Sequence, residues 1–305
     1  MRSCKRMAVA SVFAAGLLVL WSCKGKSSGQ QAAPNPPAEP TWTATRVAVV
    51  EKMNVPESVV VDPDTGMAYV SNVEGGPGLA WAADGKAFIS RLKPGGELDA
   101  LRWKDSSRQA LLNAPKGLCI FKGNLYAADI SRVVSFPLGT ASPSKPVTFP
   151  PGRRYNDMAA DGEAVYVSDT AAGKVIRADE KGHRPVKAPQ SVNGITFFKG
   201  RMFGVSWGLH EVYELDAKGK AEPKPFGLAK HFSSLDGIEL LDDGTFIVSD
   251  YAANKVCTIS PDRKTVRTLV KVETPADIGL DRKRGLLYVP EFEHQRVVVY
   301  KLQKK

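Results

Sequence analysis

Hydrophobic and polar residues recur along the chain in one repeating order, and residues 235–250 show it most clearly. Asp236 opens a short apolar run, the pair Asp243-Gly244 follows it, and a second β-rich run ends at Asp250. This order predicts a β-hairpin, because an Asp-Gly pair between two apolar runs favours a tight turn. Two strands alone cannot bury an apolar face, so repeated hairpins must pack around a shared core.

The same order of features occurs six times along the chain. Each copy begins with a polar anchor residue, and its second β-rich run ends roughly 14 residues later. Successive anchors lie about 40 residues apart, except for a longer first step that contains an insertion at residues 73–86. Such a period is typical of β-propellers. We therefore predict an all-β fold, a six-bladed β-propeller with four-stranded blades over residues 43–305. Its anchors are Glu57, Lys116, Asn156, Asn193, Asp236 and Asp277.

Two further features of the repeat bear on the fold. The second run of each copy ends on a residue that is usually acidic or polar: Asn72, Asp129, Asp169, Trp207, Asp250 and Glu291. Residues 43–50 are also β-rich, and we expect them to pair with residues 296–302. That pairing would join the two ends of the chain in one blade and close the ring.

The first residues do not follow the repeat. Residues 1–22 combine a basic head with an apolar run, which predicts an export signal. The run that ends at Cys23 resembles the lipobox of bacterial lipoproteins, in which the cysteine is lipidated after cleavage. Residues 23–42 are rich in proline and small polar residues and predict a disordered tether. We therefore expect a lipoprotein of the bacterial cell envelope, facing the periplasm and attached to a membrane through Cys23. Ordinary secretion and an uncleaved membrane anchor are the alternatives.

The formal net charge of +10 changes this picture little. Basic residues are scattered along the chain, and no run of lysine and arginine alternates with aromatic residues. We therefore expect no nucleic-acid partner. We also expect the protein to be a monomer.

The candidate chemistry lies in the anchors. The first strand of every propeller blade lines the central channel, so the anchors are expected to form one ring of polar side chains. Carboxylate and carboxamide oxygens are the ligands of hard divalent cations. The same ring is equally compatible with a channel filled by polar side chains and water that binds nothing specific. The spacing alone does not separate the two interpretations.

A family resemblance favours the first interpretation. Four successive blades carry it, through these residues: Glu57, Arg154-Tyr155-Asn156, Asn193-Gly194 and Asp236-Gly237. Together they resemble the senescence marker protein, gluconolactonase and luciferin-regenerating-enzyme family of six-bladed β-propellers, over roughly residues 55–302. The resemblance implies one divalent metal ion bound by Glu57, Asn193 and Asp236. Calcium is the first candidate, followed by zinc, magnesium and manganese. It also implies that Arg154 and Asn156 contact a lactone substrate.

The chain departs from the family pattern at three anchors. Ser58 follows Glu57 in place of the family's Gly-Pro, Lys116 adds a cation to the ring, and Asp277 adds another carboxylate. Lys116 is expected either to pair with Asp157 or Asp277 or to bind an anionic substrate.

The resulting hypothesis is a metal-dependent hydrolase that acts on a lactone or ester. In it, Asp236 serves as the general base, Arg154 stabilises developing negative charge, and the metal ion polarises the carbonyl group. The alternative is a non-catalytic envelope β-propeller that binds a protein, glycan or small ligand at its rim or central channel. A third possibility is an esterase on the same fold that resembles strictosidine synthase or paraoxonase.

Overall fold

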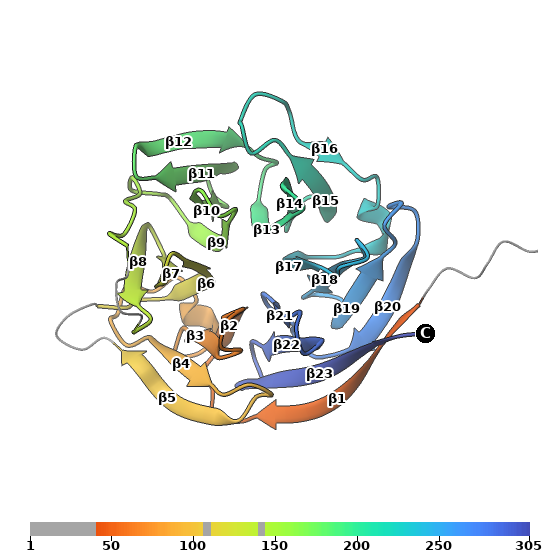
Figure 1. Ribbon diagram of the computed structural model, residues 1–305, viewed down its shortest axis with the longest axis horizontal. Helices are drawn as coiled ribbons and strands as arrows, with labels where there is room; N and C mark the ends of the chain where they lie inside the picture. Colours follow the sequence, from red (N-terminus) through yellow and green to blue (C-terminus); the bar gives the residue numbers. More distant parts are fainter. Residues whose placement is uncertain (1–40, 106–110, 140–143) are drawn as a thin grey trace, which may run out of the picture. The chain divides into compact units, whose positions relative to one another are not determined.

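The computed structural model describes residues 41–105, 111–139 and 144–305. Within them, six antiparallel sheets are arranged around a central axis, so the chain forms a six-bladed β-propeller (Figure 1). The expected export signal, tether and lipidation site at Cys23 lie outside the described residues. None of the described helices has the length and hydropathy of a membrane span.

Each of blades 1 to 3 is a run of consecutive strands that starts at the axis. Blade 1 contains β2 (Pro56–Val61), β3 (Ala68–Asn72), β4 (Phe88–Leu92) and β5 (Leu98–Asp105). Blade 2 contains β6 (Pro115–Phe121), β7 (Asn124–Asp129) and β8 (Arg132–Pro137). Blade 3 contains β9 (Tyr155–Ala160), β10 (Val165–Asp169), β11 (Lys174–Asp179) and β12 (Gly182–Lys187). Blade 2 thus differs from the predicted four strands, because its described residues form three.

Blades 4 to 6 complete the ring. Blade 4 contains β13 (Val192–Phe198), β14 (Arg201–Ser206), β15 (Glu211–Leu215) and β16 (Lys224–Pro225). Blade 5 contains β17 (Leu235–Leu240), β18 (Phe246–Asp250), β19 (Lys255–Ile259) and β20 (Val266–Lys271). Blade 6 contains β21 (Gly279–Asp281), β22 (Leu286–Glu291), β23 (Arg296–Lys304) and, outermost, β1 (Trp42–Val50).

The ring is closed by strands from both ends of the described chain. β1 pairs antiparallel with β23, from Trp42 opposite Lys304 to Val50 opposite Val297. This confirms the expected pairing and makes blade 6 a composite of the two ends. Opening the ring therefore requires the loss of a complete strand ladder.

The anchor residues of blades 1 to 5 sit in β-bulges of the inner strands. In blade 1 the pairing passes from Pro56 opposite Asn72 to Ser58 opposite Ser71 and skips Glu57. Equivalent register shifts occur at the anchors of blades 2 to 5. A bulge re-aims a side chain and leaves a backbone amide outside the ladder. A serine of the second strand can accept that amide, as in the 2.7 Å bond from the Gly237 N–H to Ser249 Oγ.

The recurring acid at the end of the second strand holds the loop that leads into the inner strand. Asp169 Oδ1 accepts the Arg154 N–H at 2.9 Å, and Asp250 Oδ1 accepts the Ser234 N–H at 2.9 Å. Asp129 does the same for Ala114. These acids therefore have a structural role. By holding the loop before each inner strand, they position the anchor at the start of that strand.

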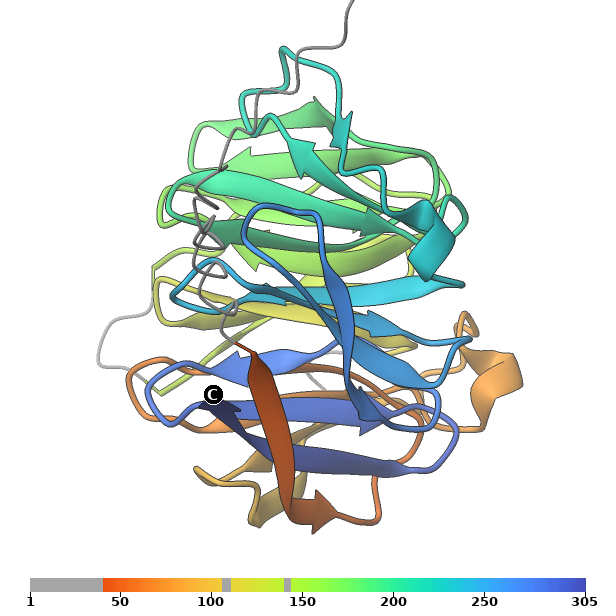
Figure 2. The ribbon, with the colours of Figure 1, turned by 90° about the vertical axis from the view of Figure 1, so that its right-hand side faces the viewer.

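Glycine after an anchor allows the inner strands of neighbouring blades to come into backbone contact. A Cβ atom on Gly194 would lie 2.3 Å from the Asp236 carbonyl oxygen, and one on Gly237 would lie 2.6 Å from the Ile278 nitrogen. Apolar side chains then fill the space between the blades, as where Phe203 of blade 4 meets Phe246 of blade 5 with ring centres 5.0 Å apart. Figure 2 shows the ring edge-on, with the short helices η1 (Pro77–Leu79) and η2 (Ala229–His231) on the same side.

Candidate functional site

Most of the predicted site residues line one cavity at the end of the channel where the inner strands begin. The cavity has a volume of about 360 Å³. It brings together residues from the inner strands of blades 1 to 5 and the loop before β9: Glu57, Lys116, Arg154, Asn156, Asn193 and Asp236. The other lining residues are Ala80, Trp81, Thr170, Trp207, Tyr251 and Phe292.

Glu57 and Lys116 form a buried ion pair. Lys116 is 2% exposed, and its Nζ lies 3.8 Å from Glu57 Oε1. Burial lowers the pKa of Lys116, and the carboxylates of Glu57 and Asp236 oppose that change. Burial raises the pKa of Glu57 well above its usual value, and Lys116 opposes that rise. The second oxygen of Glu57, Oε2, is buried and has no hydrogen-bond partner in the described structure.

Asn193 and Asp236 form the second buried pair. Asn193 Nδ2 donates to Asp236 Oδ1 at 2.9 Å, and Asn193 Oδ1 is left buried without a partner among the described residues. Burial raises the pKa of Asp236 to about 7, while Lys116 and the bond from Asn193 act to lower it. A carboxyl group that titrates near neutrality can both take up and return a proton under ordinary conditions.

The donor chemistry at this cavity fits one cation. Two buried oxygens, Glu57 Oε2 and Asn193 Oδ1, lack partners, and hard cations bind carboxylate and amide oxygens. Lys116 contacts Oε1 of Glu57 and leaves Oε2 free. In residues 41–105, 111–139 and 144–305, no three His, Cys, Asp or Glu side chains share a metal position. A cation here would therefore be held by two carboxylates, from Glu57 and Asp236, and by the amide oxygen of Asn193.

Arg154 and Asn156 line the cavity from blade 3, with Asn156 in β9 and Arg154 just before it. Asn156 is buried, whereas Arg154 is exposed and its Cζ lies 5.2 Å from the ring centre of Trp81. Within the described residues, no acidic side chain pairs with the Arg154 guanidinium. Its positive charge is therefore available to a ligand in the cavity.

Asp277 does not join the cavity that holds the other anchors. Its Oδ2 accepts the Ser58 hydroxyl at 2.5 Å, and its backbone N–H donates to the Glu57 carbonyl at 2.9 Å. Asp277 thereby links blade 6 to blade 1. The expected pairing of Lys116 with Asp277 or Asp157 is replaced by the pair with Glu57, because both aspartates already have partners in the neighbouring blade.

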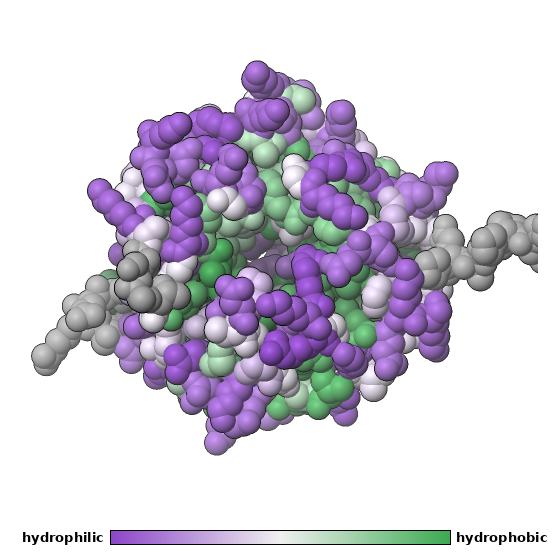
Figure 3. Space-filling view, in the orientation of Figure 1, coloured by the Kyte–Doolittle hydropathy of each residue, from purple (hydrophilic) through white to green (hydrophobic). Residues whose placement is uncertain are grey.

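Asp157 makes the corresponding link between blades 3 and 4. Its Oδ1 accepts the Met158 N–H and its Oδ2 accepts the Ile195 N–H, both at 2.6 Å. Burial raises the pKa of Asp157 well above its usual value, and the two amide bonds oppose that rise. Asp157 and Asp277 line a different cavity, of about 200 Å³, together with Glu239 and Arg282. The side of the ring facing away from η1 is hollowed at its centre (Figure 3).

The sequence analysis missed an aromatic wall. Trp207, Tyr251 and Phe292 each lie one residue after the second strand of their blade, which places them around the cavity from three consecutive blades. Trp207 was interpreted as a strand end, but β14 ends at Ser206. The signal that could have found the wall is the identity of the residue that follows each second strand.

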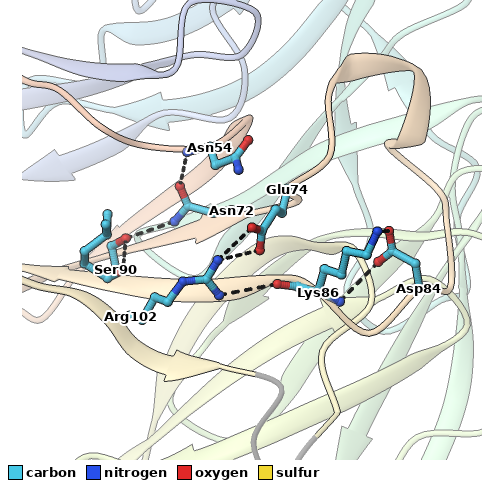
Figure 4. A network of polar contacts seen from close by, with 8 residues as sticks. Asn54, Asn72, Glu74, Asp84, Lys86, Ser90 and Arg102 are labelled. Atoms are coloured by element: carbon cyan, nitrogen blue, oxygen red, sulfur yellow. Dashed lines mark hydrogen bonds and ion pairs between the residues drawn. The ribbon is translucent and has the colours of Figure 1, made fainter.

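The sequence analysis also did not identify Trp81 as a site residue, although it recognised the loop that carries Trp81 as an insertion. The loop leaves β3, passes through η1 and returns at β4, and it places Trp81 against the cavity. Its base is held by Arg102, whose Nη2 lies 2.7 and 2.6 Å from the two carboxylate oxygens of Glu74 (Figure 4). Arg102 Nη1 also donates to the Lys86 carbonyl at 3.5 Å. Both ends of the loop are thus attached to β5.

Comparison with known proteins identifies the fold. No family model matches the chain, and no curated protein matches it in sequence. A gluconolactonase-like structure aligns with a TM-score of 0.61 and 17% identity over 88% of this chain and 94% of its own. A protein of unknown function from Bacteroides thetaiotaomicron aligns with a TM-score of 0.61 and 12% identity over 87% of this chain and 77% of its own.

Structures of virginiamycin B lyase and streptogramin B lyase have the same architecture. An inactive variant of virginiamycin B lyase from Staphylococcus aureus, solved with quinupristin, aligns with a TM-score of 0.55 and 14% identity over 86% of this chain and 99% of its own. Identities this low carry information on the fold alone. The chain is thus a six-bladed β-propeller that resembles gluconolactonase-like and virginiamycin B lyase structures.

Proposed function

We propose that this protein is a metal-dependent hydrolase that acts on a lactone or ester. The observation that carries the proposal is the pair of buried oxygens without partners, Glu57 Oε2 and Asn193 Oδ1, at the cavity that also contains Asp236. An unsatisfied buried polar atom is costly, so two of them at one cavity favour a bound cation. The ion would be divalent, with calcium as the first candidate and zinc, magnesium and manganese as the others.

Such an ion, when bound, would polarise the substrate carbonyl and make water more acidic. The remaining work is assigned to side chains of this chain. Asp236 takes a proton from the attacking water as the water oxygen bonds to the carbonyl carbon. When the carbon to oxygen bond of the ester breaks, the same proton passes to the leaving oxygen.

Two positive side chains of the lining, Arg154 and Lys116, complement this step. Arg154 has no acidic partner among the described residues, so its guanidinium can stabilise negative charge that develops on the substrate. Asn156 can orient the substrate through its amide. Lys116 is held by Glu57 and adds a second positive charge.

We also propose that the reaction takes place in the bacterial cell envelope. This part of the proposal depends on the sequence alone, through the export signal at residues 1–22 and the lipobox-like run that ends at Cys23. The protein would then be a lipid-anchored monomer that faces the periplasm and acts on a small molecule.

The test combines metal analysis with turnover. We expect the purified protein to hold one divalent ion per chain and to hydrolyse members of a lactone and aryl-ester panel assayed with calcium, zinc and manganese. Asp236→Ala should lose the ion, and turnover should fall by roughly 10²–10⁴-fold. Asp242→Ala is the matched control, because the Asp242 side chain is 86% exposed and lies outside the cavity. Full metal content and full activity in Asp236→Ala would remove the assignment.

One observation favours the alternative, a non-catalytic binding propeller. Lys116 places a positive charge beside Glu57, which reduces the negative charge available to a cation. If the purified protein holds no divalent ion and hydrolyses no member of the panel, the cavity is a non-catalytic binding site. The Lys116 ammonium group then takes the place of a metal ion beside Glu57.

A further inference from the structure

The wall of the candidate site suggests the chemical class of its ligand. Trp207 and Tyr251 have ring centres 5.3 Å apart, and Tyr251 and Phe292 have ring centres 6.0 Å apart. The three residues therefore form a continuous aromatic arc from blades 4, 5 and 6. Trp81, from the insertion in blade 1, adds a fourth ring to the same lining.

The cations of the site lie against these rings. Lys116 Nζ is 5.0 Å from the ring centre of Trp81 and 5.5 Å from that of Phe292, so it connects Trp81 to the aromatic arc. Arg154 approaches the Trp81 ring as well, at 5.2 Å. Cation–π contacts of this kind hold the rings in place. A ligand would therefore meet a wall that is already formed and would not have to order it.

The aromatic wall offers few polar partners. The Tyr251 hydroxyl is occupied, because it donates to Glu293 at 2.9 Å. The polar atoms that lack partners, Glu57 Oε2 and Asn193 Oδ1, belong to other residues of the lining. A sugar lactone carries hydroxyl groups around its whole ring, and each one that is buried against the aromatic wall without a partner costs about 1–3 kcal/mol.

A flat apolar ring has the opposite balance. It gains about 25 cal/mol for each Å² of apolar surface removed from water, and it can pack against aromatic faces without leaving polar groups unpaired. A cavity of about 360 Å³ lies within the range of small-molecule sites. The free charge of Arg154 additionally suits a carboxylate or the developing negative charge of an acyl group.

We infer that the ligand of this cavity is an aryl ester or an aromatic lactone, with its aromatic ring packed against Trp81 and the aromatic arc and its carbonyl group at the Asp236 side. The inference rests on the proposed function in placing the substrate in this cavity. It goes further in assigning selectivity for an apolar ring over a sugar ring to Trp81, Trp207, Tyr251 and Phe292.

The experiment compares two product-like probes by calorimetry on the full chain. The probes are 3-(2-hydroxyphenyl)propionate, the hydrolysis product of dihydrocoumarin, and gluconate, the hydrolysis product of gluconolactone. We expect the aryl acid to bind at least about tenfold more tightly than gluconate. Trp81→Ala should lower the affinity for the aryl acid by about tenfold and leave the affinity for gluconate nearly unchanged. Trp81→Phe should retain most of the affinity for the aryl acid.

Trp103→Phe is the matched control. Trp103 packs against Tyr69 and Phe136 and does not line the cavity, so the variant should bind both probes as the parent does. Thermal unfolding of every variant will show whether a loss of affinity comes from a loss of folding. Equal or tighter binding of gluconate, unchanged aryl affinity in folded Trp81→Ala, or no binding of either probe at millimolar concentration would overturn the inference.

Turnover of the two lactones separates this inference from the proposed function. If gluconolactone is hydrolysed faster than dihydrocoumarin, the proposed hydrolase function is retained and the proposed selectivity for aryl substrates is wrong. If the aryl acid binds in a Trp81-dependent manner and neither lactone nor any ester is hydrolysed, the inferred aryl ligand class is retained and the proposed hydrolase function is wrong.

Discussion

The two cavities of the ring contain buried carboxylates in opposite situations. At the candidate site, Glu57 keeps an oxygen without a partner, and Asp236 lies beside the unpartnered oxygen of Asn193. At the other cavity, both oxygens of Asp157 accept backbone amides, and Asp277 accepts the Ser58 hydroxyl. Burial raises the pKa of all four acids. Burial and a shifted pKa therefore do not distinguish the two cavities, whereas the oxygens without partners, Glu57 Oε2 and Asn193 Oδ1, lie at the candidate site.

The largest expected effect tests the charge balance at the candidate site. Lys116→Met keeps an unbranched side chain that is one atom shorter, and it leaves Glu57 buried without its counter-charge. This change should lower the free energy of unfolding of the metal-free protein by about 3–5 kcal/mol. Added calcium should restore more stability to the variant than to the parent, because a cation can replace the lost ammonium. Urea unfolding with and without calcium measures both effects. A variant that calcium fails to stabilise would contradict a cation site at Glu57.

The next effect tests the structural role of the other cavity. Asp157→Ala leaves the amides of Met158 and Ile195 without their acceptor, and we expect a loss of about 2–4 kcal/mol in the free energy of unfolding. Metal content should stay at the parent value in the folded protein, which is the opposite of Asp236→Ala. If Asp157→Ala loses the ion while remaining folded and stable, the distinction between the two cavities fails.

A smaller effect is expected where both cavities depend on close contact between blades. Gly194→Ala would bring a Cβ atom to 2.3 Å from the Asp236 carbonyl oxygen, so the inner strands of blades 4 and 5 must separate. We expect a loss of about 1–3 kcal/mol in stability, together with weaker metal binding because Asn193 and Asp236 move apart. Gly78→Ala is the matched control, since no atom lies within 4 Å of its added methyl group and its φ is not positive. Chemical unfolding and metal titration of the two variants give the comparison.

The smallest effect is expected at the insertion between β3 and β4, which places Trp81 at the candidate site. Arg102→Ala removes the ion pair to Glu74 at the base of the loop, a partly exposed contact that we expect to contribute about 1 kcal/mol or less to stability. Because the pair holds the loop that carries Trp81, binding of the aryl acid should weaken by a few fold while gluconate binding stays constant. Arg201→Ala removes a comparable partly exposed pair outside the cavity, with Glu214, and should leave both affinities unchanged.

Much of the architecture was predictable because it is encoded locally and repeatedly. Every repeat contains its own hairpin, and Asp236-Gly237 and Asn193-Gly194 mark an anchor followed by a residue that tolerates close backbone contact. The number of copies sets the number of blades, and the β-rich residues at 43–50 and 296–302 supply the closing pair. Convergence of the first five anchors on one cavity then follows from the geometry of a ring.

Which of the anchor side chains pair with one another was decided by the tertiary structure alone. Lys116 pairs with Glu57 because Asp157 and Asp277 are occupied by the neighbouring blade, and no spacing along the chain contains that information. The aromatic wall arose in the same way, since Trp81 comes from an insertion and the other rings come from blades 4 to 6. The sequence by itself determined which residues reach the axis, because that depends on a repeat. The folded structure determined which of their atoms remain free, because that depends on contacts between repeats.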